Sequence, residues 1–165
     1  MARHLNNLAA LLQATNRLAE AEPLMRRALT IDEQNFGKDH PNVAIDLNNL
    51  AALLQATNRL AEAEPLMRRA LTIDEQSFGK DHPDVARDLN NLAQLLKATN
   101  RLAGAEPLMR RGLEILIRFT RATGYPHPHL QTFVNNYVRL LGAMERTRQQ
   151  TLETLRKMAP EFFPK

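Results

Sequence analysis

Apolar side chains recur along this chain at the spacing of an amphipathic helix. Leu47, Leu50, Ala51 and Leu54 lie at positions i, i+3, i+4 and i+7, which places them on one side of a helix. The same spacing returns after a short polar stretch, over residues 63–71. The pattern therefore predicts two consecutive helices joined by a turn.

This pair of predicted helices repeats with a period of 42 residues. The segment Leu-Asn-Asn-Leu-Ala begins at Leu5, at Leu47 and at Leu89, and the first two copies differ at only five positions. The period divides a single array over residues 1–165 into repeat 1 at 1–42, repeat 2 at 43–84, repeat 3 at 85–126, a degenerate capping repeat at 127–159 and a tail at 160–165.

Proline and glycine mark the ends of the predicted helices. His82-Pro83 predicts the start of a first helix, because proline is tolerated in the first helical turn. Gly79 predicts the end of a second helix, and Thr57-Asn58 predicts the turn and N-cap between the two helices of a repeat. One hairpin cannot bury its own apolar stripe, whereas stacked hairpins form a continuous core. We therefore expect an all-α solenoid of helix hairpins.

The spacing Leu47-x2-Leu50-Ala51-x2-Leu54-x8-Ala63-x3-Met67-x2-Ala70 resembles the tetratricopeptide repeat. The longer unit, with Phe78-Gly79-Lys80-Asp81-His82-Pro83, is similar to the 42-residue subtype of kinesin light chains and many bacterial proteins. The resemblance is strong up to about residue 115 and implies a bacterial source. It also implies a right-handed superhelix of antiparallel hairpins, whose first helices line a concave groove that holds peptides or partner helices.

Polar residues occupy the other side of each predicted first helix. An Asn pair recurs there in all four copies, although Asn is unfavourable inside a helix because its side chain competes for backbone hydrogen bonds. The predicted groove consists of Asn6, Asn7, Gln13, Ile45, Asn48, Asn49, Gln55, Arg87, Asn90, Asn91, Gln94, Lys97, Asn135, Asn136 and Arg139.

The amides of these Asn pairs suit the backbone of an extended partner, because each offers donors and an acceptor. In the kinesin light chain family, asparagines at matching positions contact cargo peptides, so the resemblance implies the same role here. The alternative is that one Asn of each pair bonds to a neighbouring helix and only satisfies a buried group.

The charge of the chain is uneven. The formal net charge is +4, with an acidic middle and a basic C-terminal half. Basic residues enter the predicted groove only late, at Arg87, Lys97 and Arg139. We therefore expect a protein or peptide partner with acidic character toward the C-terminal end of the groove. The alternative is that these cations are solvated surface charges.

Several function classes are not expected from this sequence. It has no cysteine and no phosphate-binding loop, nucleophile elbow or clustered metal ligands, so we expect no catalytic residue, no metal and no cofactor. The pair Arg68-Arg69 recurs near acidic residues and few aromatics are present, so nucleic acid is not an expected partner. No apolar run is long enough to span a membrane, and we expect a cytoplasmic protein.

The primary interpretation is a non-catalytic scaffold that binds a peptide or partner protein. Two alternatives stay open at this point. One is a structural assembly unit whose near-identical repeats stack end to end or swap helices. Its homo-oligomers would form through a terminal repeat or through the tail, with Glu161-Phe162-Phe163 docked into a second copy. The other is a regulatory module of a larger bacterial signalling protein. Within a single chain, we expect the tail to fold back over the end of the stack.

Overall fold

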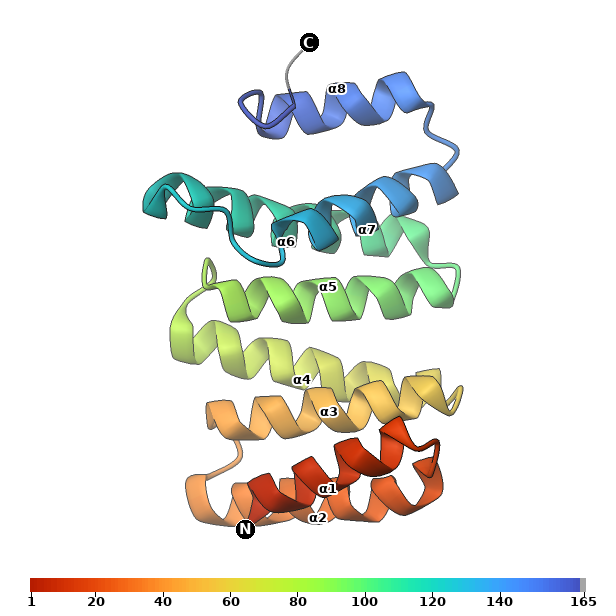
Figure 1. The fold of residues 1–165 in the computed structure, drawn as a ribbon, viewed down its shortest axis with the longest axis vertical. Coiled ribbons are helices and arrows are strands. Elements are labelled where there is room, and N and C mark those ends of the chain that lie inside the picture. Colours follow the sequence, from red (N-terminus) through yellow and green to blue (C-terminus); the bar gives the residue numbers. More distant parts are fainter. Residues whose placement is uncertain (164–165) are drawn as a thin grey trace. The chain divides into compact units, whose positions relative to one another are not determined.

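A computed structural model describes residues 1–163, so the last two residues of the predicted tail lie outside the described part. Over the described residues the secondary structure is entirely helical (Figure 1). The helices are α1 (Ala2–Ala14), α2 (Leu18–Phe36), α3 (Pro41–Ala56), α4 (Leu60–Phe78), α5 (Pro83–Ala98), α6 (Leu102–Thr123), α7 (Leu130–Ala143) and α8 (Arg148–Met158). Within this range no helix is long and apolar enough to cross a membrane.

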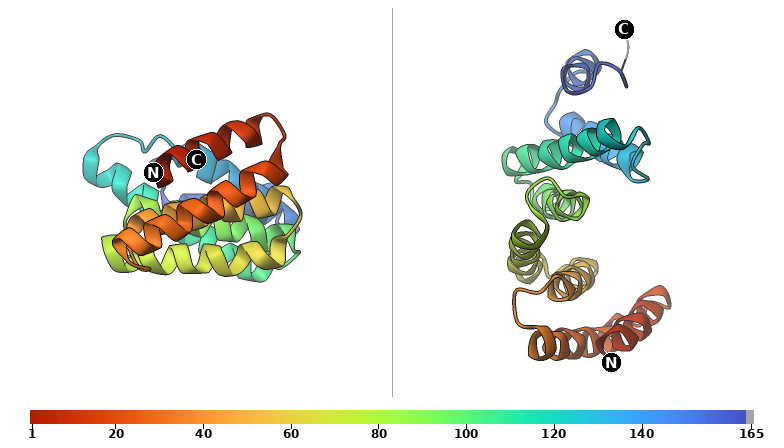
Figure 2. Two further views of the ribbon diagram at one scale, coloured as in Figure 1. Left: turned by 90° about the horizontal axis from the view of Figure 1, so that it is seen from below. Right: turned by 90° about the vertical axis from the view of Figure 1, so that its left-hand side faces the viewer.

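The helices form two compact units. The N-terminal unit, Met1–Lys80, contains α1 to α4, and the C-terminal unit, Asp81–Lys165, contains α5 to α8. In the N-terminal unit α1 packs on α2 and α3 packs on α4, each as a hairpin whose helices lie side by side (Figures 1 and 2). In the C-terminal unit α5 packs on α6, and α6 packs on α7. These hairpins are the helix pairs that the periodic pattern predicts.

The ends of the helices follow from local chemistry. α5 begins at Pro83, and Nδ1 of His82 accepts a hydrogen bond from the backbone N–H of Asp84 at 3.2 Å. α4 ends at Phe78 and is followed by Gly79, whose φ of +86° is strained for other residues. The predicted start at Pro83 and the predicted end at Gly79 are confirmed.

The turn inside each hairpin uses an asparagine. Asn58 has φ +60°, the left-handed conformation that Asn tolerates better than most residues, and the Thr57 hydroxyl donates to the carbonyl of Leu53 at 3.1 Å. The predicted turn is therefore present, but its predicted role as an N-cap is wrong. The residue before α4 is Arg59, and its side chain does not cap the helix.

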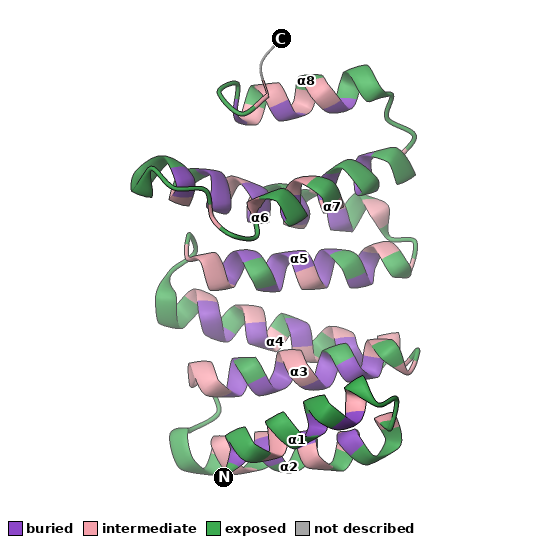
Figure 3. Ribbon diagram, in the orientation of Figure 1, coloured by how far each residue is buried: buried purple, intermediate pink, exposed green. Residues whose placement is uncertain are grey.

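The predicted apolar stripes form the core of each unit, as the buried segments of Figure 3 show. In the N-terminal unit Leu47, Ala70 and Ile73 pack together between α3 and α4. In the C-terminal unit Tyr137 is fully buried and its hydroxyl donates to Oε1 of Glu106 at 2.8 Å. Helix packing in both units is therefore set by the residues of the repeat pattern.

Gly112 stands on α6 where the first two repeats have alanine. A Cβ atom at this position would lie 3.2 Å from Cε1 of Phe133 on α7 and 3.2 Å from the carbonyl oxygen of Ala86 on α5. Few real Cβ contacts are that short, so the missing methyl group makes room for the larger Phe133 ring. The divergence of repeat 3 thus accompanies the aromatic packing of α7.

The degenerate repeat keeps two helices, although its second half has lost the repeat pattern. α8 begins with a capping box, in which the Thr147 hydroxyl accepts from the N–H of Gln150 and the Gln150 side chain accepts from the N–H of Thr147. α8 contacts α7 only sparsely. The described part of the tail lies against its own chain, where Glu161 forms an ion pair with Arg121 of α6 at 2.6 Å.

Candidate functional site

Most of the predicted groove residues line polar pockets on the first helices. In the C-terminal unit a pocket of about 270 Å³ lies between α5 and α7. We call it the α5–α7 pocket, and it is lined by Gln94, Lys97, Ala98, Met109, Asn136 and Arg139. Four of these six residues belong to the predicted groove, and Met109 of α6 adds an apolar side chain that was not predicted from the sequence.

The α5–α7 pocket carries positive charge without an acidic residue in its lining. Neither Lys97 nor Arg139 forms an ion pair with another described residue. Gln94 and Asn136 add amide groups that both donate and accept hydrogen bonds. The arrangement therefore suits a carboxylate, which can accept hydrogen bonds from several of these groups at once.

In the N-terminal unit a second pocket of about 270 Å³ lies among α1, α2 and α3. We call it the α1–α3 pocket, and it is lined by Arg3, Asn6, Asn7, Asp32, Asn42, Ile45, Asp46 and Asn49. Asn6, Asn7, Ile45 and Asn49 were predicted for the groove, whereas the two acidic residues were not. The pocket thus has a different chemistry from the one between α5 and α7.

Asp46 is the most deeply buried group of the α1–α3 pocket, with only 2% of its surface exposed. Its Oδ1 accepts a hydrogen bond from Nδ2 of Asn6 at 2.5 Å. Burial, together with the charge of the nearby Asp32 carboxylate, raises the pKa of Asp46 from 3.8 to about 6, although the Asn6 bond acts in the opposite direction. A second acidic group beside a buried one is costly unless a cation or a proton is present.

A third pocket, again of about 270 Å³, lies among α5, α6 and α7. We call it the α5–α6 pocket, and it is lined by Pro83, Arg87, Asn90, Leu116, His127, His129, Thr132 and Phe133. By the repeat alignment it is the counterpart of the α1–α3 pocket, with Arg87 and Asn90 in place of Arg3 and Asn6. Leu116 and Phe133 occupy the positions of Asp32 and Asp46, so the acidic pair is replaced by apolar side chains.

Asparagines of the recurring pairs line a pocket, form a hydrogen bond to another helix, or do both. Asn90 is only 6% exposed, and its Oδ1 accepts a hydrogen bond from Nδ2 of Asn136 at 3.0 Å. Asn6 bonds in a similar way to the next first helix through Asp46. Three of the four pairs therefore contain an amide used between helices, namely Asn6, Asn90 and Asn136, and Asn7 and Asn49 line a pocket. The remaining predicted groove residues lie outside these three pockets: Gln13, Asn48, Gln55, Asn91 and Asn135.

Comparison with known proteins decides the family. The profile of the tetratricopeptide repeat matches residues 1–76 and 47–118. The chain belongs to the tetratricopeptide-repeat family. The predicted family resemblance and the all-α repeat fold are confirmed, and tetratricopeptide repeats are in general scaffolds for protein–protein interaction.

Solved structures support the same fold for this tetratricopeptide chain. The crystal structure of nearly identical TPR-like repeats from Podosopora anserina, assigned as a kinesin light chain, matches with TM-score 0.81 and 22% identity over 94% of this chain and 72% of that chain. The crystal structure of BtubC (BKLC) from P. vanneervenii matches with TM-score 0.80 and 20% identity over 99% of this chain and 65% of that chain. No curated protein matches the sequence.

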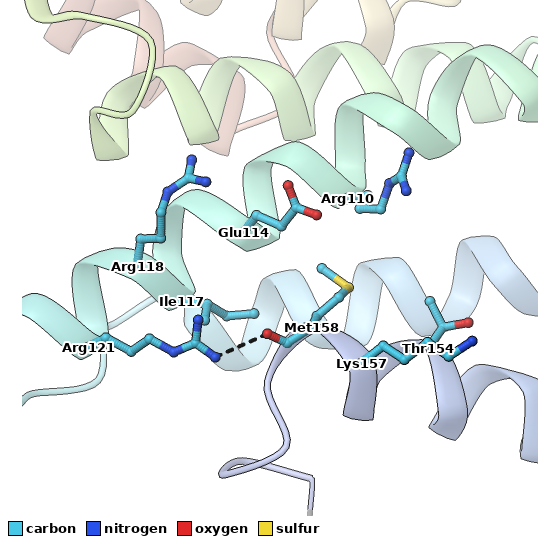
Figure 4. Close-up of a pocket in the computed structure, with 8 residues that line it drawn as sticks. All are labelled: Arg110, Glu114, Ile117, Arg118, Arg121, Thr154, Lys157 and Met158. Carbon is cyan, nitrogen blue, oxygen red and sulfur yellow. Dashed lines mark hydrogen bonds between the residues drawn. The ribbon is translucent and has the colours of Figure 1, made fainter.

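The tetratricopeptide chain also has a basic pocket of about 420 Å³ between α6 and α8 (Figure 4). Its arginines are already paired with carboxylates that do not line it. Arg118 pairs with Asp81 and Arg121 pairs with Glu161, both at 2.6 Å, and Arg121 also donates to the carbonyl of Met158. The pocket is therefore a weaker anion site than the one between α5 and α7. Within residues 1–163 no three His, Asp or Glu side chains gather as a metal site.

Sequence reasoning missed the acidic pair because its members come from different helices. Asp46 lies on a first helix and Asp32 on a second helix, and only packing brings them to one pocket. A signal was nevertheless present, because both aspartates recur one period later, at Asp74 and Asp88. Asp46 also stands at one of the few positions where the first two repeats differ, since repeat 1 has His4 there.

Proposed function

We propose that this tetratricopeptide chain is a non-catalytic scaffold that binds a protein or peptide segment against its first helices. The observation that carries the proposal is the α5–α7 pocket, where Lys97 and Arg139 face a shared space without an acidic residue in its lining. Such a pocket on a repeat scaffold suits an acidic side chain of a partner. Hydrogen bonds to charged groups contribute about 1.5–3 kcal/mol each, enough to select a carboxylate over an amide.

A peptide library tests this proposal directly. The immobilised chain is offered peptides in which Asp or Glu alternates with Asn or Gln at each position, and bound sequences are identified. We expect enrichment of acidic residues, which Lys97→Ala combined with Arg139→Ala abolishes. The matched control is Lys38→Ala combined with Lys157→Ala, which removes two positive charges outside this pocket. Equal binding of acidic and amide peptides would contradict the proposal.

Self-assembly is a second candidate, and exposed apolar residues of α1 favour it. Leu8 and Leu11 are 47% and 62% exposed, whereas Leu50 and Leu53 at the same repeat positions of α3 are buried. This surface can stack on a helix of another copy. Sedimentation equilibrium over a range of concentrations tests it, and Leu11→Glu should reduce any oligomer to monomer. A constant monomer mass for the unaltered chain excludes this candidate.

A further inference from the structure

We propose that the α1–α3 pocket binds the ammonium group of a lysine side chain from the partner. This inference rests on the proposed scaffold function and assigns a second kind of partner residue to it. The pocket belongs entirely to the N-terminal unit, and its chemistry is opposite to that of the α5–α7 pocket.

The pocket offers hydrogen-bond acceptors that its own residues leave unused. Oδ2 of Asp46 and Oδ1 of Asn6 are both buried, and neither accepts a hydrogen bond from any residue of the described chain. Asn6 already directs its amide donor to Oδ1 of Asp46. The carboxylate of Asp32 is a third acceptor in the same pocket. An ammonium group has three donors and no acceptor, so it matches this set in number and in kind.

The negative charges of the α1–α3 pocket also favour the binding of a cation. Asp46 of α3 is desolvated and is repelled by the nearby carboxylate of Asp32 on α2, and Arg3 of α1 is the only basic residue in the lining. Arg3 is exposed and forms no ion pair with another described residue. Apart from a proton shared between the two carboxyl groups, nothing in the lining neutralises the acidic pair, and burying a charge without a partner is unfavourable.

The counterpart pocket of the C-terminal unit shows that the fold does not require an acidic pair. Arg87 and Asn90 stand where Arg3 and Asn6 stand, but the aspartates are replaced by Leu116 and Phe133. Hydrophobic side chains thus fill the same place between three helices. Since buried apolar groups are often at least as stabilising as buried charges, stability alone does not require the acidic pair of the N-terminal unit.

A lysine fits this pocket better than a metal ion does. The lining supplies two carboxylates and no third acidic or histidine side chain. Ile45 also lines the pocket and is 48% exposed, which gives the methylene stem of a lysine an apolar surface to cover. A volume of about 270 Å³ leaves room for such a stem as well as for the ammonium group.

The test is an NMR titration of the full chain at millimolar concentration with the peptide acetyl-Gly-Gly-Lys-Gly-Gly-amide. We expect saturable shifts of the side-chain amide signals of Asn6, Asn42 and Asn49. The same peptide with acetylated lysine should leave these signals unchanged. Asp46→Asn should weaken binding by about tenfold or more, and Asp32→Asn should do the same. The matched control is Asp39→Asn, which removes an acidic residue outside the pocket and should not change the affinity.

A merely structural role for the acidic pair would not reproduce the expected pH dependence. Because the ammonium group needs a charged carboxylate, the affinity should fall as the pH is lowered through about 6, the pKa of Asp46, and this fall should disappear in Asp46→Asn. Circular dichroism checks that both aspartate variants are folded. If Asp46→Asn does not fold, Asp32→Asn carries the test alone.

Three results would overturn the inference. One is an equal response to lysine and acetyl-lysine peptides, a second is no response at all, and the third is tighter binding of calcium or magnesium chloride at the same signals. Failure here is distinguishable from failure of the scaffold function. If library peptides still bind through Lys97 and Arg139 while the lysine peptide gives no shifts, the scaffold function stands and only the lysine site is rejected.

Discussion

Asp46 shows how one residue makes the stability of the N-terminal unit depend on pH. Its pKa is raised from 3.8 to about 6, mainly because it is buried and secondarily because Asp32 is near. Between these values the folded chain holds a proton that the unfolded chain has released. The stability that this group contributes is therefore complete below about pH 4 and is lost as the pH rises through about 6.

Replacing the Asp46 carboxylate by an amide should remove the loss of stability that occurs as the pH rises through about 6. Asp46→Asn keeps an oxygen that accepts from Asn6, so we expect the variant to match the parent near pH 4 and to exceed its stability above pH 7 by up to about 3 kcal/mol. Urea unfolding at both pH values measures the difference. Asp39→Asn serves as the control and should change neither value. A variant that is less stable than the parent above pH 7 would contradict the account.

Residues at the same repeat position contribute different amounts to the free energy of unfolding in different helices. Leu50 of α3 is 1% exposed, whereas Leu8 at the equivalent position of α1 is about half exposed. Leu50→Ala should cost about 2–5 kcal/mol of unfolding free energy, because it leaves a cavity in a packed core. Leu8→Ala should cost less than about 1 kcal/mol. Denaturant unfolding of the two variants tests the pair, and equal losses would mean that Leu8 is covered in solution.

At the scale of elements, helix ends depend on particular backbone conformations. Gly79 follows α4 with φ +86°, and no atom lies within 4 Å of a Cβ placed there. Gly79→Ala should therefore destabilise by about 1–3 kcal/mol through backbone strain alone. Gly142 lies inside α7, also with open space around its Cβ position, so Gly142→Ala should stabilise by up to about 1 kcal/mol. Thermal unfolding should shift in opposite directions for the two variants.

The sequence predicts the helices well because their signals are local. Leu47, Leu50 and Leu54 fix the buried side of α3, and Pro83 and Gly79 fix helix ends, without any knowledge of the partner helix. The burial of Asp46 is different, because it depends on how closely α1 and α2 approach α3. Sequence spacing does not give that distance. For the same reason the chemistry of a pocket could be predicted only where all its polar residues lay on first helices, as in the α5–α7 pocket.

At the scale of the whole molecule, charge is divided between the two units. Residues 1–80 carry nine basic and ten acidic side chains, whereas residues 81–165 carry thirteen basic and eight acidic ones. The C-terminal unit therefore carries the excess positive charge, and we expect it to be the unit that attracts the proposed acidic segment from solution. Such an attraction acts over a long range and should add to the proposed contacts inside the α5–α7 pocket.

The salt dependence of binding should separate the long-range attraction from the contacts inside the α5–α7 pocket. Added salt shortens the screening distance from about 10 Å at 0.1 M to about 3 Å at 1 M, so binding of an acidic library peptide should weaken steadily with salt. The control variant, Lys38→Ala with Lys157→Ala, should keep most of this dependence, because Lys97 and Arg139 still face the peptide. The pocket variant, Lys97→Ala with Arg139→Ala, should bind weakly at every salt concentration and show a much flatter dependence. Fluorescence anisotropy measures both curves. Similar curves for the two variants would place the acidic segment outside the α5–α7 pocket, on the general positive surface of the C-terminal unit.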